Sequence, residues 1–236
     1  MKASMGKEKT ARSKKTLIVD IILLVVSICL FVASCFVFVT RVYLTTFHVN
    51  GQSMWPTFNE YALDADGNEV GQRGGKSYVG YTVECGLYNK HKGALKRLER
   101  FDIVVTHYST FGDSEMIKRI VGLPGEKIQF ISSGENNGDL YVNGKYVEQP
   151  IRTDVLRQAS YPVEPIQLGN DEYYVCGDNR SNSTDSRSKS VGPVTRSMLV
   201  GKVVAIIGTG VIKEDENGER FVKYSKIQKY RKVRFF

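Results

Sequence analysis

The stretch Leu140-Tyr-Val-Asn-Gly-Lys-Tyr-Val147 has the pattern of two short strands joined by a two-residue turn. Apolar and polar side chains alternate on both sides of Asn143-Gly144, a dipeptide that readily adopts the positive φ angles of a tight hairpin turn. Hairpins of this kind belong to antiparallel sheets, in which neighbouring strands are joined by short connections. The segment therefore predicts an antiparallel, mostly β domain.

Apolar, β-branched runs on either side of the hairpin extend this prediction, and no long window shows helical periodicity. The further predicted strands are 101–106, 116–121, 173–176 and 199–207. Residues 60–92 are instead rich in glycine and asparagine, and we interpret them as a surface excursion rather than a second core. One β-rich domain is expected over residues 41–212.

Residues 17–39 form an apolar run in which Asp20 is the sole charged residue. As a helix the run would be about 34 Å long, enough to cross a hydrocarbon core of about 30 Å. Basic residues crowd the preceding segment, 1–16, whereas Arg41 is the only one between the run and Arg73. This imbalance predicts a single-pass anchor in the cell membrane, with a cytoplasmic N-terminus and an extracellular main domain.

A cleavable signal peptide is the alternative interpretation of this N-terminal region. The basic start, the apolar stretch and the small residues from Ala33 to Cys35 all suit one. However, the apolar run continues through Val39 and exceeds the length of about 7 to 15 residues that is usual in signal peptides. Lipid attachment at Cys35 is a further alternative, and it would leave the main domain on the same side of the membrane.

Charge and cysteine content exclude several classes of function. Much of the net charge of +8 lies in the N-terminal segment and in the tail, 213–236, and such basic runs are solvated or contact anionic lipid more often than they bind nucleic acid. Cys85 and Cys176 could form a disulfide, although the sequence does not establish the geometry that one needs. No CxxC or HExxH motif and no cluster of histidines with carboxylates is present, so we expect no metal site.

Ser53 lies in Gly51-Gln-Ser-Met-Trp-Pro-Thr57, where Gly51 frees the backbone and Pro56 stiffens it. The segment could simply be a turn, but it could also hold a hydroxyl at a defined, exposed position. A serine hydroxyl becomes a nucleophile only when a base takes its proton. None of the histidines has a sequence context typical of a catalytic triad, which leaves a neutral lysine as the candidate base.

Lys118 is the only lysine in the strand predicted at 116–121. Alternation along a strand places it on one face with Met116 and Ile120. Burial among such neighbours would lower its pKa from the usual value of about 10.4, so that a neutral amine could act as base near neutral pH. The alternative is that Lys118 lies at an exposed sheet edge, where a charge discourages strand pairing.

The loop 177–187 contains short polar side chains that could hold a lysine in place, and Arg187 could pair with a carboxylate. Asn182-Ser-Thr184 also fits the acceptor pattern for an N-linked glycan. A calcium loop is a further alternative, although Asp178 and Asp185 alone supply few carboxylates for calcium.

Four segments together resemble the conserved boxes of bacterial type I signal peptidases, in the single-span form of Gram-positive bacteria. They are GQSMWPT at 51–57, RFDIVV at 100–105, KRIVGLPGE at 118–126 and GDNRSNSTDSR at 177–187. The resemblance implies a β-rich serine peptidase, without a cofactor, that removes signal peptides from exported preproteins at the lipid bilayer. It gives no indication of nucleic-acid binding.

The resemblance also implies roles for particular residues. Ser53 matches the nucleophile and supplies a backbone N–H to the oxyanion, and Lys118 matches the general base. Ser183 and Asp185 match residues that orient the lysine. Structural roles are implied for Arg119, Asp178 and Arg187. Gly51 stands where some members carry a serine or threonine hydroxyl, so this chain lacks that oxyanion donor.

Two rival functions are considered. One is a specialised Ser-Lys peptidase for pilus or conjugation proteins, and the other is a non-catalytic, membrane-anchored assembly factor. A self-cleaving repressor would share the chemistry, but the apolar run at 17–39 argues against a cytosolic DNA-binding protein.

Trp55 and Phe58, close to the nucleophile, are expected at the lipid interface, which favours aromatic side chains.

Overall fold

The computed structural model describes residues 14–49, 51–59, 82–109, 112, 114–224 and 234–236. The chain divides after Tyr43 into two compact units. The first contains helix α1 (Lys14–Tyr43), and the second contains the strands.

Helix α1 extends four residues beyond the apolar run predicted at 17–39. Its segment Leu17–Tyr43 is long and apolar enough to cross a membrane by length and composition, with a mean hydropathy of 3.1 in the most apolar window. No part of that window is buried in the structure, and Phe31, for example, is 70% exposed. An apolar helix with exposed side chains on every face has the character of a membrane span rather than of a soluble core helix.

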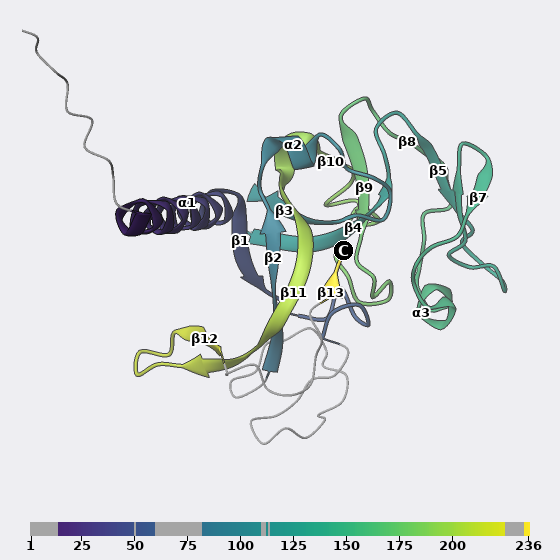
Figure 1. The fold of residues 1–236 in the computed structure, drawn as a ribbon. Helices are drawn as coiled ribbons and strands as arrows, with labels where there is room; N and C mark the ends of the chain where they lie inside the picture. Colours follow the sequence, from purple (N-terminus) through teal and green to yellow (C-terminus); the bar gives the residue numbers. More distant parts are fainter. Residues whose placement is uncertain (1–13, 50, 60–81, 110–111, 113, 225–233) are drawn as a thin grey trace, which may run out of the picture. The chain divides into compact units, whose positions relative to one another are not determined.

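The described residues of the second unit form a nine-stranded main sheet in which every pairing is antiparallel (Figure 1). Seven strands follow the order β1-β2-β11-β3-β4-β9-β10, and β12 and β13 also pair with β11. The bounds are β1 Leu44–His48, β2 Thr82–Asn89, β3 Ile103–Tyr108, β4 Ser114–Gly122, β9 Glu172–Cys176, β10 Val194–Thr195, β11 Leu199–Glu214, β12 Arg220–Tyr224 and β13 Arg234–Phe235. The prediction of a mostly β, antiparallel fold is confirmed.

A smaller sheet follows β4 in the chain and has the order β7-β6-β5-β8. Its strands are β5 Lys127–Phe130, β6 Leu140–Val142, β7 Lys145–Val147 and β8 Ile166–Gln167. The hairpin predicted at Asn143-Gly144 joins β6 and β7, and the two residues have φ angles of 50° and 79°. Short helices α2 (Lys92–Leu95) and α3 (Thr153–Arg157) and the 3₁₀ helix η2 (Arg196–Met198) complete the described elements.

Strand β4 contributes side chains to three hydrophobic clusters, which fixes its position firmly. Val121 packs with the small sheet, Ile120 packs with β3 and β9, and Ile117 packs beside Met54 and Phe58. Each buried aliphatic side chain contributes roughly 1.5–3 kcal/mol of hydrophobic stabilisation. A residue carried by this strand is therefore held where the three clusters meet.

The predicted surface excursion at 60–92 is wrong in its second half. Residues Thr82–Asn89 form β2, which lies inside the main sheet between β1 and β11. Gly86 interrupts the strand pattern in the sequence, but glycine is required at this position, because a Cβ there would lie 2.6 Å from the Ala205 carbonyl oxygen. Residues 60–81 lie outside the described part of the chain.

The predicted boundary of the C-terminal tail at 213 is also wrong. Strand β11 continues to Glu214, and β12 and β13 pair with it. The many charged residues of this region concealed its strands in the sequence. The strands form nevertheless, because the long edge of β11 offers main-chain hydrogen bonds to a backbone of any composition. The basic residues between 225 and 233 lie outside the described residues, and their contact with lipid stays a prediction.

Cys85 and Cys176 are both buried and free. They lie on β2 and β9, which are four strand spacings apart in the main sheet. At about 4.8 Å per spacing the separation far exceeds the limit of about 7 Å between the Cα atoms of a disulfide. The possibility of a disulfide between them is therefore wrong for this fold.

Candidate active site

Ser53 lies in a tight turn that follows β1 in the chain. The turn begins at Gly51, whose φ of 124° favours glycine, and the Phe58 N–H closes it by donating to the Met54 carbonyl over 2.9 Å. Met54 and Phe58 are fully buried and anchor the turn in the core. The prediction that Phe58 contacts lipid is therefore wrong, because its ring is buried in the protein core.

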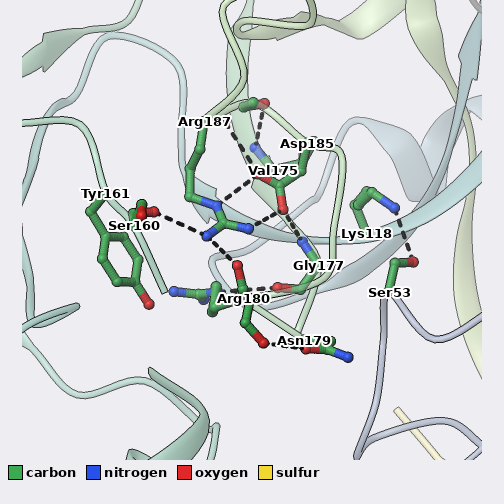
Figure 2. A network of polar contacts seen from close by, with 12 residues as sticks. Ser53, Lys118, Ser160, Tyr161, Val175, Gly177, Asn179, Arg180, Asp185 and Arg187 are labelled. Atoms are coloured by element: carbon green, nitrogen blue, oxygen red, sulfur yellow. Dashed lines mark hydrogen bonds and ion pairs between the residues drawn. The ribbon is translucent and has the colours of Figure 1, made fainter. Parts of the chain in front are cut away.

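Lys118 lies on β4, an internal strand between β3 and β9, and its Nζ is hydrogen-bonded to Ser53 Oγ over 3.1 Å. Nζ also donates to the Ile117 carbonyl over 3.2 Å. The Lys118 side chain is only 2% exposed, so the alternative that it lies exposed at a sheet edge is wrong, although β9 pairs with β4 only from the next residue onward. Figure 2 shows the lysine and serine side chains pointing toward each other from different segments.

Burial lowers the pKa of Lys118 from 10.5 to about 8. Negative charges at Asp185 and Asp178, and any on Cys176, oppose this effect, whereas the Arg187 guanidinium adds slightly to it. Removal from water is thus the main cause, since it disfavours the charged ammonium. With this pKa, about a tenth of the lysine is neutral at pH 7 and about nine tenths at pH 9, so the amine is available as a base near neutral pH.

The buried lysine should reduce the stability of the fold, so Lys118→Met is expected to raise it at pH 7. A pKa that falls from 10.5 to about 8 on folding corresponds to roughly 3 kcal/mol. Between these pH values the unfolded chain binds more protons, so wild-type stability rises with pH across this window. The variant's advantage should therefore be largest below pH 8 and vanish above pH 10.5, as measured by urea unfolding.

The matched control for this measurement is Lys127→Met, because Lys127 is an exposed lysine at the start of β5. Its replacement should leave the pH dependence of stability unchanged. A Lys118→Met protein no more stable than wild type at pH 7 would show that the lysine is not held at a depressed pKa.

Asp185 organises the loop that lies beside the lysine (Figure 2). Its carboxylate accepts from the Gly177 N–H over 2.9 Å and from two nitrogens of Arg187, each over 2.8 Å. Burial alone raises the pKa of Asp185, but the Arg187 guanidinium and the Gly177 N–H outweigh it and hold that pKa below its ordinary value. Asp185 therefore stays ionised, and its negative charge acts on Lys118 electrostatically.

Ser183 lies at the wall of the same cavity as Ser53 and Lys118. Its Oγ is buried and has no partner at hydrogen-bond geometry among the described residues, although it is close enough to Asp185 to help keep that pKa low. The backbone passes close to its neighbours here, since a Cβ at Gly177 would clash with Ser183 Oγ and with the Ser53 carbonyl oxygen. The structure thus brings Ser183 to the site without bonding it to the lysine.

Arg119 and Asp178 join β4 to the start of the loop. Arg119 donates to the two carboxylate oxygens of Asp178 over 2.8 and 2.6 Å, and to the Phe101 carbonyl over 2.9 Å. Asp178 is fully buried. This bidentate ion pair fixes the loop relative to the strand that carries Lys118.

Sequence reasoning missed two backbone contacts that hold Ser53 in place. The Asn179 N–H donates to the Ser53 carbonyl over 3.0 Å, and Gly177 packs against the same carbonyl. Side-chain types do not predict contacts between main-chain atoms, although the glycine at 177 indicated that another backbone segment approaches closely there. The loop therefore positions the serine as well as the lysine.

The dyad opens into a cavity of about 340 Å³, lined by 48–49, 51–54, 115–118 and 182–184. Strand β9 pairs with β4 only from Arg119 onward, so the edge of Ser114–Lys118 that faces away from β3 has no strand partner among the described residues. Among the described residues, none accepts a hydrogen bond from the Ser53 N–H. The arrangement brings a serine hydroxyl, a lysine amine, an N–H donor and a free strand edge together in one groove.

Three comparisons relate this chain to known proteins. The family model described as "Signal peptidase, peptidase S26" matches residues 18–208. Signal peptidase I V of Bacillus subtilis (strain 168) is 31% identical over 176 residues, covering 70% of this chain and 86% of that protein. Signal peptidase I of Bacillus amyloliquefaciens is 29% identical over 209 residues, covering 84% and 91%. A crystal structure of a signal peptidase I from Enterococcus faecalis V583 has 26% identity and a TM-score of 0.38, covering 45% of this chain and 96% of that one.

Proposed function

Because this chain belongs to the signal peptidase family, peptidase S26, we propose that it is a membrane-anchored endopeptidase that removes signal peptides from exported preproteins with Ser53 and Lys118. The observation that carries the proposal is the 3.1 Å contact between Ser53 Oγ and Lys118 Nζ. The lysine is 2% exposed and has a pKa of about 8, which are the properties of a general base.

In this mechanism the neutral Lys118 amine takes the proton of Ser53 as Oγ attacks the scissile carbonyl. Negative charge then develops on the carbonyl oxygen, where the Ser53 N–H can donate to it. The protonated lysine returns its proton to the leaving amine, and an acyl-enzyme remains. The same amine activates a water molecule that hydrolyses the ester.

The free edge of β4 suits an extended substrate. A peptide strand laid along Ser114–Lys118 would pair with the sheet by main-chain hydrogen bonds and pass its scissile bond over Ser53. Val49, Met54 and Ile117 give this groove an apolar lining. Its modest volume favours small side chains beside the cleaved bond.

Anchoring follows from α1, which we propose crosses the cell membrane once. The basic segment 1–16 would lie in the cytoplasm, the span would cover 17–39 and its extension to Tyr43, and the catalytic unit would lie outside. A preprotein is itself held in the bilayer by its signal peptide. Confining both partners to one membrane raises their effective concentration.

The proposal predicts cleavage of a model preprotein at its signal junction, with a rate that rises with pH. Detergent-solubilised protein should show a kcat/KM that increases through a midpoint near pH 8 and levels off above it, because only neutral Lys118 accepts the proton. Mass spectrometry of the product locates the cleaved bond. A flat rate between pH 6 and 9 would contradict Lys118 as the base.

The same assay separates the rival functions. Cleavage confined to pilin-like or conjugation precursors would identify a specialised peptidase. A folded wild-type protein that cleaves no precursor would instead favour the non-catalytic assembly factor.

A further inference from the structure

The final described residues return to the catalytic unit along an edge of β11. Strand β2 occupies one edge of β11, while β3 and β12 occupy the two ends of the other. Strand β13 fills the gap between them, where Phe235 pairs with Ala205 and the Phe236 N–H donates to the Val204 carbonyl over 3.0 Å. The family model matches residues 18–208, so β13 lies outside the residues that the model matches.

This strand places the ring of Phe236 against Phe58. The two ring centroids are 5.4 Å apart at an interplanar angle of 81°, an edge-to-face arrangement that aromatic pairs favour. A second ring, Phe47 of β1, meets Phe58 at 6.5 Å and 65°. Phe58 is thus held by rings from two strands and is fully buried.

Phe58 in turn fixes the nucleophile turn. Its N–H donates to the carbonyl of Met54, the residue that follows Ser53, over 2.9 Å. A shift of Phe58 therefore carries Met54 with it, and with Met54 the Ser53 hydroxyl. The reaction depends on the placement of that hydroxyl against Lys118, and misplacement by about 1 Å can cost a rate factor of about 10².

We propose that Phe236, which follows β13 and lies outside the residues that the family model matches, is a positioning residue for Ser53 and acts through Phe58. This inference rests on the proposed role of Ser53 as nucleophile. It concerns the placement of the turn and assigns Phe236 no contact with the substrate.

The chain supplies a matched control and an internal probe. Phe235 is the neighbouring residue, and its side chain is 81% exposed against 42% for Phe236, so the two rings face different surroundings. Trp55 is the single tryptophan of the chain and lies in the nucleophile turn two residues after Ser53. Its fluorescence therefore reports the turn directly, without any need for activity.

The experiment compares full-length wild type, Phe236→Ala, Phe236→Tyr and Phe235→Ala in detergent, with preprotein cleavage and acrylamide quenching of Trp55 as readouts. Phe236→Ala should lower kcat about tenfold with KM changed less than about twofold, because the turn and not substrate binding is disturbed. Quenching of Trp55 should rise in this variant. Phe235→Ala should match wild type, and Phe236→Tyr should keep at least about half of kcat because the ring contact remains.

The proposal is overturned if Phe236→Ala and Phe235→Ala give the same kcat and the same quenching. It is equally overturned if Phe236→Ala loses activity only in proportion to lost folded protein, with Trp55 of the folded fraction quenched as in wild type. Should Phe236→Ala fail to fold, Phe236→Leu decides, with an expected fall in kcat of about threefold and increased quenching. If wild type cleaves no precursor, the proposed function fails, but the quenching comparison still tests the positioning of the turn.

Discussion

Replacing Ser53 or Lys118 with alanine is expected to lower kcat by about 10⁴-fold or more, with little change in KM. Ser53→Ala removes the attacking oxygen, and Lys118→Ala removes the group that takes its proton across the 3.1 Å contact. Since the two act as one unit, the double variant should be no slower than either single variant. Lys118→Arg should not restore activity, because a guanidinium stays protonated at any working pH.

Exposed residues of the same types provide the controls. Ser133→Ala and Lys127→Ala lie away from the groove and should retain wild-type rates. Single-turnover cleavage of a preprotein, followed by gel and mass spectrometry, measures all of these variants. Strictly multiplicative losses in the double variant would show that serine and lysine do not cooperate in one step.

Asp178→Ala is expected to destabilise the catalytic unit by about 3–5 kcal/mol. The carboxylate is fully buried and binds two nitrogens of Arg119, which is itself 7% exposed. Its removal leaves a guanidinium in the interior with only neutral oxygen acceptors, and an uncompensated buried charge is costly. Chemical unfolding of wild type and variant in detergent measures the difference.

The pair Arg152 and Asp154 gives the matched comparison, because its side chains are 58% and 53% exposed. Asp154→Ala should leave the unfolding midpoint unchanged, since water replaces an exposed ion pair at little cost. If both aspartate variants unfolded at the same denaturant concentration, burial would not be what makes the Arg119 pair important.

The β-rich fold could be predicted because its signals are local, whereas the proposed roles of Ser53 and Lys118 depended on the resemblance of four separated segments to a known family. Asn143-Gly144 is a hairpin signal contained in two residues, and Lys118 is conspicuous within its apolar run. The strand β2 was missed because its residues include Glu84 and Gly86, which do not follow an apolar alternation. Its place in the sheet depends on Phe47 and Ala205, which pack close to Gly86 from distant parts of the chain.

The support of the site was harder to predict than its chemistry. Asp185 was expected to hold the lysine, but its hydrogen bonds go to Arg187 and Gly177, and its effect on Lys118 is electrostatic. Ser183 reaches the cavity wall without bonding to the lysine. Such partners depend on how a loop folds back on itself, which residue types alone do not specify.

The connectivity of the site has a consequence for the folding of the chain. Ser53 and Lys118 are 65 positions apart, and β4 meets β9 only after the whole small sheet has been traversed. Contacts between such distant segments form slowly, because each requires the closure of a long loop. Ser53 and Lys118 should therefore come together late in folding, so that a half-folded molecule lacks the proposed catalytic pair until its architecture is complete.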